Sequence, residues 1–281
     1  MKSLSAKFLL ILCLSAFIIS CVQKSGENAD ETLAVDSTQE YVGEEVTYST
    51  DSTTMKGYLA YDKNSTDKKP GILVVHEWWG HNEYTRERAD MLAKLGYVAL
   101  AVDMYGDGKV AQHPQDAQKF MMSVFSNIEE AEARFDKALE LLKSNEKVDG
   151  QQIGVIGYCF GGSVALTMAN MGKDLDAVAA FHSGVQLPVM PTSDIKAKIL
   201  VCNGGADPFV SEESVENFKS AMDSVNASYK YIAYDSAKHA FTSKGATAMG
   251  EKFELPLEYN AEADEASWEE MKALFSDVFT K

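Results

Sequence analysis

The stretch GVIGYCFGGSVAL (154–166) joins the end of an apolar strand to the start of a buried helix through a glycine-rich turn. Glycines occupy positions 157, 161 and 162, and Cys159 stands at the apex. Glycine permits backbone angles and close approaches that other residues resist. The pattern therefore predicts a tight strand-to-helix turn that presents Cys159, and this cysteine could be structural, redox-active, metal-bound or nucleophilic.

Apolar runs of strand length recur on both sides of this turn and alternate with helical segments. The central runs lack polar alternation, which is typical of parallel strands covered on both faces. The expected strands are 72–76, 98–102, 153–156, 177–181, 199–202 and 231–234, and the expected helices are 86–95, 127–143, 163–168, 215–225 and 268–279, with an edge hairpin of 46–48 and 55–61. This alternation predicts an α/β fold with a mostly parallel central sheet flanked by helices on both faces. Ser126 and Glu129 have the spacing of a capping box at the start of the helix over 127–143.

The first twenty residues have the pattern of a secretory signal peptide. Lys2 and Lys7 give the start of the chain its positive charge. The apolar run over 8–19 that follows is too short to span a bilayer. The stretch Ile18-Ile19-Ser20-Cys21 resembles the bacterial lipoprotein box, in which Cys21 is lipidated and becomes the mature N-terminus. An ordinary signal peptide cut near Ser20, or a free N-terminal anchor, is the alternative.

This interpretation divides the chain into three parts. Residues 1–20 are a lipoprotein signal peptide, and residues 21–40 are polar and acidic, which predicts a disordered tether. Residues 41–281 are long enough for one large α/β domain. We therefore expect a lipid-anchored protein of the bacterial cell envelope that faces the periplasm or the medium.

Composition limits the partners. The net charge is −16, and the only arginines are Arg86, Arg88 and Arg134. Since the chain has no basic stripe, nucleic acid is a poor candidate partner, and the acidity mostly indicates solubility. Outside the first 21 residues the cysteines are Cys159 and Cys202. Cys202 lies in an apolar run and is expected to be a buried inert thiol, although a bridge to Cys159 stays open.

Three residues at expected strand ends have the chain order of a hydrolase triad. Gly157-Tyr158-Cys159-Phe160-Gly161 has the form of a nucleophile elbow, in which the N–H of Phe160 faces a developing oxyanion. Its position at a helix N-terminus favours a reactive thiolate. Asp207 follows the expected strand 199–202, and His239 follows the expected strand 231–234. We therefore predict that His239 is the base and that Asp207 is the acid that orients it. Asp235 is the alternative acid, and activity is expected to rise between pH 5 and 8 as His239 loses its proton.

The stretch HEWWGH (76–81) suggests two kinds of site. His76, Glu77 and His81 invite a metal interpretation, but the histidines are five apart beyond a strand, unlike the zinc-protease signature. The alternative is the loop after the third strand, in which the N–H of Trp78 completes the oxyanion hole. Trp78, Trp79 and Tyr105 are then candidates for the wall of a substrate pocket, whereas His182 is expected to be a structural histidine.

Taken together, residues 41–281 resemble the dienelactone hydrolase family of α/β-hydrolases. The resemblance rests on HEWWG (76–80), the helix that contains Arg86, VALAVDMYGDG (98–108), GYCFGG (157–162), GGADP (204–208) and HAF (239–241), and on the closing stretch 259–279, which resembles a secreted branch of the family. It implies an α/β-hydrolase fold, hydrolysis of a small ester or lactone, and no cofactor, and the histidine spacing argues against a metal. It also implies that Cys159 is the nucleophile, that Glu77 pairs with the resting thiol, and that the N–H groups of Trp78 and Phe160 form the oxyanion hole.

One position departs from the family pattern. Characterised members hold a substrate carboxylate with arginines, one of them four residues after the catalytic histidine, where this chain has Ser243 followed by Lys244. Lys244 is a candidate substrate-binding residue at this position. Because a lysine does not replace the bidentate guanidinium of an arginine, this departure argues against an anionic lactone as the substrate. The alternatives to a hydrolase are a catalytically silent ligand-binding lipoprotein and a redox protein, although the redox case lacks a second cysteine at C-x-x-C spacing.

Overall fold

The fold is built on one eight-stranded sheet, and a computed structural model describes it within residues 39–279. The strand order is β1-β2-β4-β3-β5-β6-β7-β8. β2 is antiparallel to β1 and β4, and the pairs from β4 onward are parallel. The strands are β1 Tyr41–Ser49, β2 Thr54–Asp62, β3 Lys69–Val75, β4 Val98–Val102, β5 Val148–Tyr158, β6 Ala177–Phe181, β7 Lys198–Gly204 and β8 Tyr229–Tyr234. This is the mostly parallel α/β sheet that the sequence predicted.

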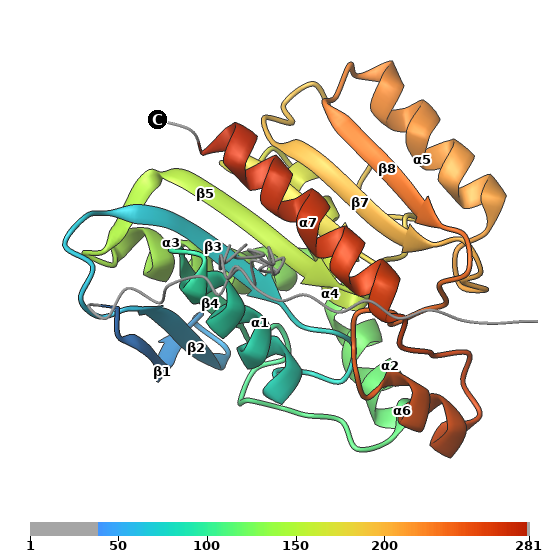
Figure 1. Cartoon of the computed structure of the whole chain (residues 1–281), viewed down its shortest axis with the longest axis horizontal. Coiled ribbons are helices and arrows are strands. Elements are labelled where there is room, and N and C mark those ends of the chain that lie inside the picture. Colours follow the sequence, from blue (N-terminus) through green and yellow to red (C-terminus); the bar gives the residue numbers. More distant parts are fainter. Residues whose placement is uncertain (1–38, 280–281) are drawn as a thin grey trace, which may run out of the picture. The chain divides into compact units, whose positions relative to one another are not determined.

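Helices cover both faces of the sheet. The helices are α1 Glu83–Lys94, α2 Pro114–Phe125, α3 Ile128–Ser144, α4 Phe160–Asn170, α5 Glu212–Ser224, α6 Ala246–Phe253 and α7 Ala261–Val278. Figure 1 shows α1 and α7 crossing in front of the sheet, with α3 and α4 behind it. Side chains of α3, α4 and α5 share one buried apolar cluster with alternate residues of the strands. Side chains of α1 and α7 share a second cluster with the strand residues that point the other way.

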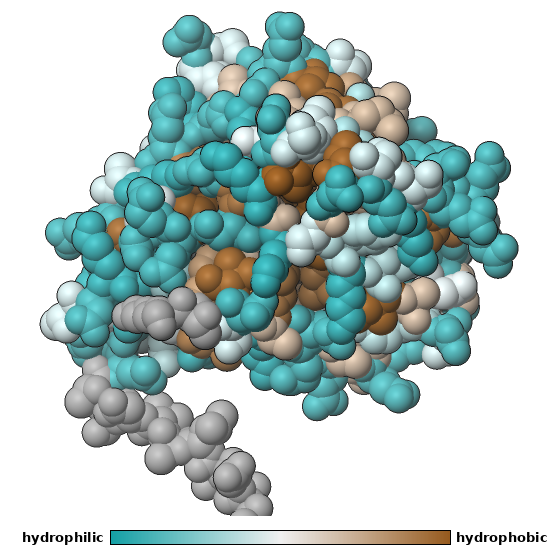
Figure 2. Space-filling model, turned by 90° about the horizontal axis from the view of Figure 1, so that it is seen from above, coloured by the Kyte–Doolittle hydropathy of each residue, from teal (hydrophilic) through white to brown (hydrophobic). Residues whose placement is uncertain are grey.

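The two clusters explain why the central strands read as continuous apolar runs. All five residues of β4 and all five of β6 are buried. Successive side chains point to opposite faces, and both faces are covered here, so no position along these strands favours a polar residue. The face shown in the space-filling view is mainly hydrophilic, and its hydrophobic side chains appear in separate patches between polar ones (Figure 2).

Some local expectations need correction. The predicted capping box at Ser126 and Glu129 is one residue early, because Asn127 is the N-cap of α3 and its side chain accepts from the N–H of Glu130. Helices α2 and α6 were not expected at all. The signal peptide, Cys21 and most of the tether lie outside the described residues. Within residues 39–279, no helix is long and apolar enough to cross a membrane.

Candidate active site

The turn between β5 and α4 holds Cys159 in a conformation that few residues adopt. Its backbone has φ +53° and ψ −115°, and its N–H donates to the carbonyl of Phe181 at 2.9 Å. A Cβ on Gly157 would lie 2.2 Å from the carbonyl oxygen of Gly161, and a Cβ on Gly161 would lie 2.3 Å from that of Val75. These contacts require glycine at both positions. Strain of this kind persists only where the surroundings enforce it, and it clusters at active sites.

The structure brings Cys159, His239 and Asp207 into direct contact. His239 Nε2 lies 3.1 Å from Cys159 Sγ, and His239 Nδ1 lies 2.7 Å from Asp207 Oδ2. Asp207 and His239 are buried, while Cys159 is partly exposed. The other oxygen of Asp207 accepts the N–H of Phe209 at 2.9 Å, which fixes the carboxylate plane. Asp235, the alternative acid, is exposed to solvent.

The surroundings of His239 favour its protonated form. Burial alone would lower the pKa of His239, but the sulfur of Cys159 and the carboxylate of Asp207 outweigh burial and raise it to about 10. The direction of this shift opposes the sequence-based expectation that His239 loses its proton between pH 5 and 8. A histidine that keeps the proton beside a sulfur stabilises a negative charge on that sulfur.

Two backbone N–H groups stand beside the elbow. Phe160 is the first residue of α4, so its N–H has no partner within the helix. Trp78 lies in the loop after β3, and neither its N–H nor that of Phe160 donates to another group in the described part of the chain. Unpaired N–H groups near a nucleophile are what an oxyanion needs.

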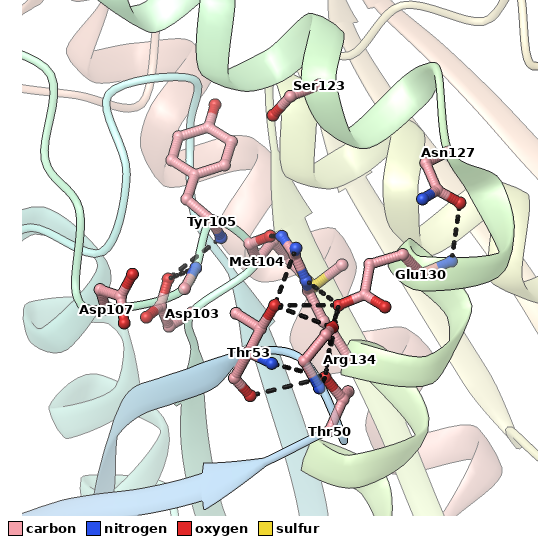
Figure 3. A network of polar contacts seen from close by, with 12 residues as sticks. Thr50, Thr53, Asp103, Met104, Tyr105, Asp107, Ser123, Asn127, Glu130 and Arg134 are labelled. Carbon is pink, nitrogen blue, oxygen red and sulfur yellow. Dashed lines mark hydrogen bonds and ion pairs between the residues drawn. The ribbon is translucent and has the colours of Figure 1, made fainter.

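The loop after β4 contacts the loop that carries Trp78 and is itself held by several hydrogen bonds. The carboxylate of Asp103 accepts the backbone N–H groups of Tyr105 at 3.0 Å and Gly106 at 2.8 Å. Arg134 donates to the carbonyl of Met104 at 2.9 Å and pairs with Glu130, as Figure 3 shows. The hydroxyl of Tyr105 in turn donates to the carbonyl of Trp78 at 2.9 Å. Tyr105 therefore positions the loop that carries Trp78.

A cavity of about 750 Å³ opens onto Cys159. Its wall is mainly apolar, and its only titratable side chains are those of Cys159 and His239. We call it the Cys159 cavity, and the residues that line it are Trp78, Pro114, Gln115, Gln118, Met121, Phe125, Cys159, Phe160, Ser163, Gly184, Gln186, Leu187, Pro188, Phe209, His239, Leu255 and Leu257.

Three expected substrate-binding residues lie elsewhere. Trp79 and Lys244 line a different cavity, and Tyr105 lies beneath Trp78 and lines neither. Trp78 is the tryptophan on the Cys159 cavity, whereas its neighbours Glu77 and Trp79 line the other cavity. Sequence reasoning missed Phe209, whose ring packs edge-on against His239 at 5.0 Å between centroids. The sequence offered one indication of this contact, because Phe209 follows the predicted acid Asp207 by two residues.

Glu77 is buried near His239, whose charge acts on it. Only 4% of its surface is exposed, and its Oε1 has no hydrogen-bond partner. Burial raises the pKa of Glu77 to about 7, although the charges of His239 and Arg88 act in the opposite direction. Within residues 39–279 no hydrogen bond joins Glu77 to Cys159, whose partner is His239.

His76, His182 and Cys202 have structural surroundings. His76 Nδ1 donates to the carbonyl of Glu77 at 2.6 Å, and its Nε2 accepts the N–H of Met104 at 3.2 Å. His182 is buried and contacts the hydroxyl of Thr242 at 2.7 Å. Among the described residues no group of three or more His, Cys, Asp or Glu side chains could hold a metal ion. Cys159 and Cys202 are both free thiols, so no bridge joins them.

Comparison with known proteins agrees with this architecture. The profile of the dienelactone hydrolase family matches residues 55–279. "Protein usf" of Aquifex pyrophilus is 30% identical over 208 residues, which cover 72% of this chain and 88% of that protein.

Two solved structures are similar over 85% of this chain and 99% of their own. One is described as "m3DLH", with 33% identity and a TM-score of 0.81. The other is a dienelactone hydrolase-like promiscuous phosphotriesterase from metagenomic libraries, with 30% identity and a TM-score of 0.79. The chain therefore belongs to the dienelactone hydrolase family of carboxylic ester and lactone hydrolases.

Proposed function

We propose that this protein hydrolyses carboxylic esters through an acyl intermediate on Cys159. The observation that carries the proposal is His239, which contacts the sulfur of Cys159 with one ring nitrogen and Asp207 with the other. A nucleophile, a base and a group that orients the base are the parts that covalent catalysis requires.

The reaction proceeds in two halves. Sγ of Cys159 attacks the ester carbonyl carbon while His239 holds the proton from the sulfur, and the N–H groups of Trp78 and Phe160 bind the resulting oxyanion. The ester C–O bond then breaks, and the alcohol leaves with the proton of His239. In the second half a water gives a proton to His239 and attacks the thioester. The C–S bond breaks, the acid leaves, and the proton is again shared between His239 and the sulfur.

The Cys159 cavity favours neutral substrates with apolar substituents. Its volume suits a small organic molecule, and no lysine or arginine lines it to bind a substrate carboxylate. A carboxylate in this wall would lose its hydration without gaining a charged partner, and such a loss is costly. We therefore propose uncharged esters or lactones as the substrate class.

Mass spectrometry of the intact protein tests this mechanism. Brief incubation with p-nitrophenyl butyrate, followed by an acid quench, should add one butyryl group, and peptide mapping should locate it on Cys159. The Cys159→Ala variant should acquire no adduct, whereas Cys202→Ala should be labelled like the wild type. Labelling of any other residue, or equal labelling of Cys159→Ala, contradicts the proposed nucleophile.

We also propose that the mature protein is a lipoprotein of the cell envelope, anchored to a membrane through lipidated Cys21. The support is the sequence alone: a charged start, a short apolar centre, and Ser20 before Cys21, followed by a polar stretch. Feeding expressing cells an alkyne fatty acid should label the wild type. Cys21→Ala should lose the label, while Cys13→Ala keeps it. Unlipidated protein with an intact N-terminus would overturn this proposal.

A further inference from the structure

A second cavity of about 850 Å³ lies next to the Cys159 cavity and shares only Leu257 with it. We call it the Glu77 cavity. Its wall comes from α1, from Glu77 and Trp79 in the loop after β3, from the segment that follows His239, and from α7. The hydrolytic mechanism uses none of this space.

Carboxylates without cationic partners surround the Glu77 cavity. Glu83, Glu87 and Glu265 are exposed on its wall, and Glu77 is its buried member. None of the four forms an ion pair within residues 39–279. The Oε1 atom of Glu77 also lacks any hydrogen-bond donor. A buried carboxylate oxygen with no partner is costly, and a positively charged ligand beside it would offset part of that cost.

The two basic residues of the cavity do not neutralise the negative charge of these four glutamates. Arg88 is buried, and its Nη2 atom is 2.7 Å from Asp264 and 2.6 Å from the carbonyl of Thr242, so its charge is already paired. Lys244 is exposed at the opening. The net charge on the wall is therefore negative, which disfavours an anionic ligand.

Aromatic and thioether side chains complete the wall. The guanidinium of Arg88 already makes cation–π contacts in this wall. It lies 5.2 Å from the ring centre of Tyr84 and 5.3 Å from that of Trp268. Trp79, Tyr259 and Met249 supply further apolar surface. Aromatic faces with nearby carboxylates attract organic cations, above all quaternary ammonium groups.

We propose that the Glu77 cavity is a second ligand site, separate from the Cys159 cavity, and that it binds a small organic ammonium compound. The ammonium group lies against Glu77, and its alkyl substituents contact Trp79 and the other apolar side chains. This site does not depend on the proposed acyl-enzyme mechanism, because none of its contacts involves Cys159.

Isothermal titration calorimetry with choline as a probe tests the proposal. At pH 8 choline should bind at least about tenfold more tightly than 3,3-dimethyl-1-butanol, its neutral isostere. Glu77→Gln and Glu265→Gln should each weaken choline binding severalfold. Glu262→Gln, an exposed position on α7 outside the cavity, is the matched control and should bind like the wild type.

Alkylation of Cys159 with iodoacetamide separates the two cavities. Choline affinity should be unchanged in the alkylated protein, although ester turnover is lost. Thermal unfolding curves establish that each variant is folded, and Trp79→Leu is a second probe if Glu77→Gln does not fold. Equal affinity for choline and its isostere overturns the proposal, as does loss of choline binding on alkylation or unchanged binding in both Glu77→Gln and Glu265→Gln.

Discussion

His239 Nε2 lies 3.1 Å from the sulfur of Cys159, although the two residues are 80 positions apart in the chain. β5 and β8 carry these residues to the same edge of the sheet, and β7 carries Asp207 beside them. Carboxyl ends of parallel strands meet at one edge, so this contact is a direct consequence of the strand order. At this distance a proton passes between nitrogen and sulfur without an intervening water.

Substitutions in the proposed triad should have non-additive effects. Cys159→Ala and His239→Ala should each lower kcat for a p-nitrophenyl ester by at least about a thousandfold, because each removes a part of one covalent mechanism. The double variant should be no slower than either single variant. Steady-state kinetics on purified, folded proteins measures this.

Asp207→Asn should also lower kcat strongly, because the amide no longer stabilises the imidazolium or fixes its orientation. Asp235→Asn is the control at the exposed alternative acid and should leave kcat unchanged. If both variants retain wild-type rates, or if the effects of Cys159→Ala and His239→Ala multiply, the assignment of roles is wrong.

The elbow should not tolerate a methyl group at Gly157. A Cβ there would lie 2.2 Å from the carbonyl oxygen of Gly161, and backbone on both sides prevents relief. Gly157→Ala should therefore lower the free energy of unfolding by at least about 2 kcal/mol, in the range of severe overpacking. Urea denaturation measures it.

Gly245→Ala is the matched control for this strain. A Cβ on Gly245 meets nothing within 4 Å, and its φ of −83° suits any residue. Its unfolding free energy should stay within about 0.5 kcal/mol of the wild type. Equal effects of the two substitutions would show that the close packing at Gly157 is not what the elbow requires.

Much of the fold was predictable because its signals are local. β4 and β6 have the predicted limits, since a fully buried strand is an uninterrupted apolar run. The contact of Cys159, Asp207 and His239 was predictable because each of these residues follows such a run in a characteristic order. Helix α2 has no capping side chain at His113, and its apolar residues do not keep to one face, because Met122 is exposed, so its pattern was weaker.

The wall of the cavity was harder to predict from sequence. Trp78 and Trp79 are adjacent and chemically identical, yet they line different cavities. Phe209, Leu187 and Leu255 come from segments without a strand or helix period. No periodicity indicates where such side chains point, so their placement depends on tertiary packing.

Glu77 should make stability depend on pH near neutrality. Its pKa rises from an ordinary 4.5 to about 7 in the folded protein, so folding favours the protonated acid. The stabilising contribution is complete below about pH 4.5 and is lost as pH rises through 7, a change of about 3 kcal/mol. Glu77→Gln cannot ionise, so it should gain stability relative to the wild type between pH 4.5 and 8.

Urea titrations at several pH values measure this difference. Glu262→Gln, an exposed substitution, should follow the wild-type pH dependence. A constant difference between Glu77→Gln and the wild type from pH 4.5 to 8 would mean that Glu77 is not the titrating group.

The charge of the substrate should decide its turnover. The Cys159 cavity contains no lysine or arginine, so a neutral aryl ester should have a kcat/KM at least about tenfold above that of an equally large ester with a free carboxylate. Met121→Arg places a guanidinium on the wall of this cavity and should raise kcat/KM for the anionic ester by about tenfold or more, as a charge-assisted hydrogen bond allows.

Met122→Arg is the matched control, because Met122 is the next residue of α2 and its side chain is exposed, outside the cavity. It adds the same charge to the protein and should leave the ratio of the two kcat/KM values at that of the wild type. If Met121→Arg and Met122→Arg change the ratio equally, long-range attraction of the anion explains the result. In that case the wall of the Cys159 cavity does not set the preference for uncharged substrates.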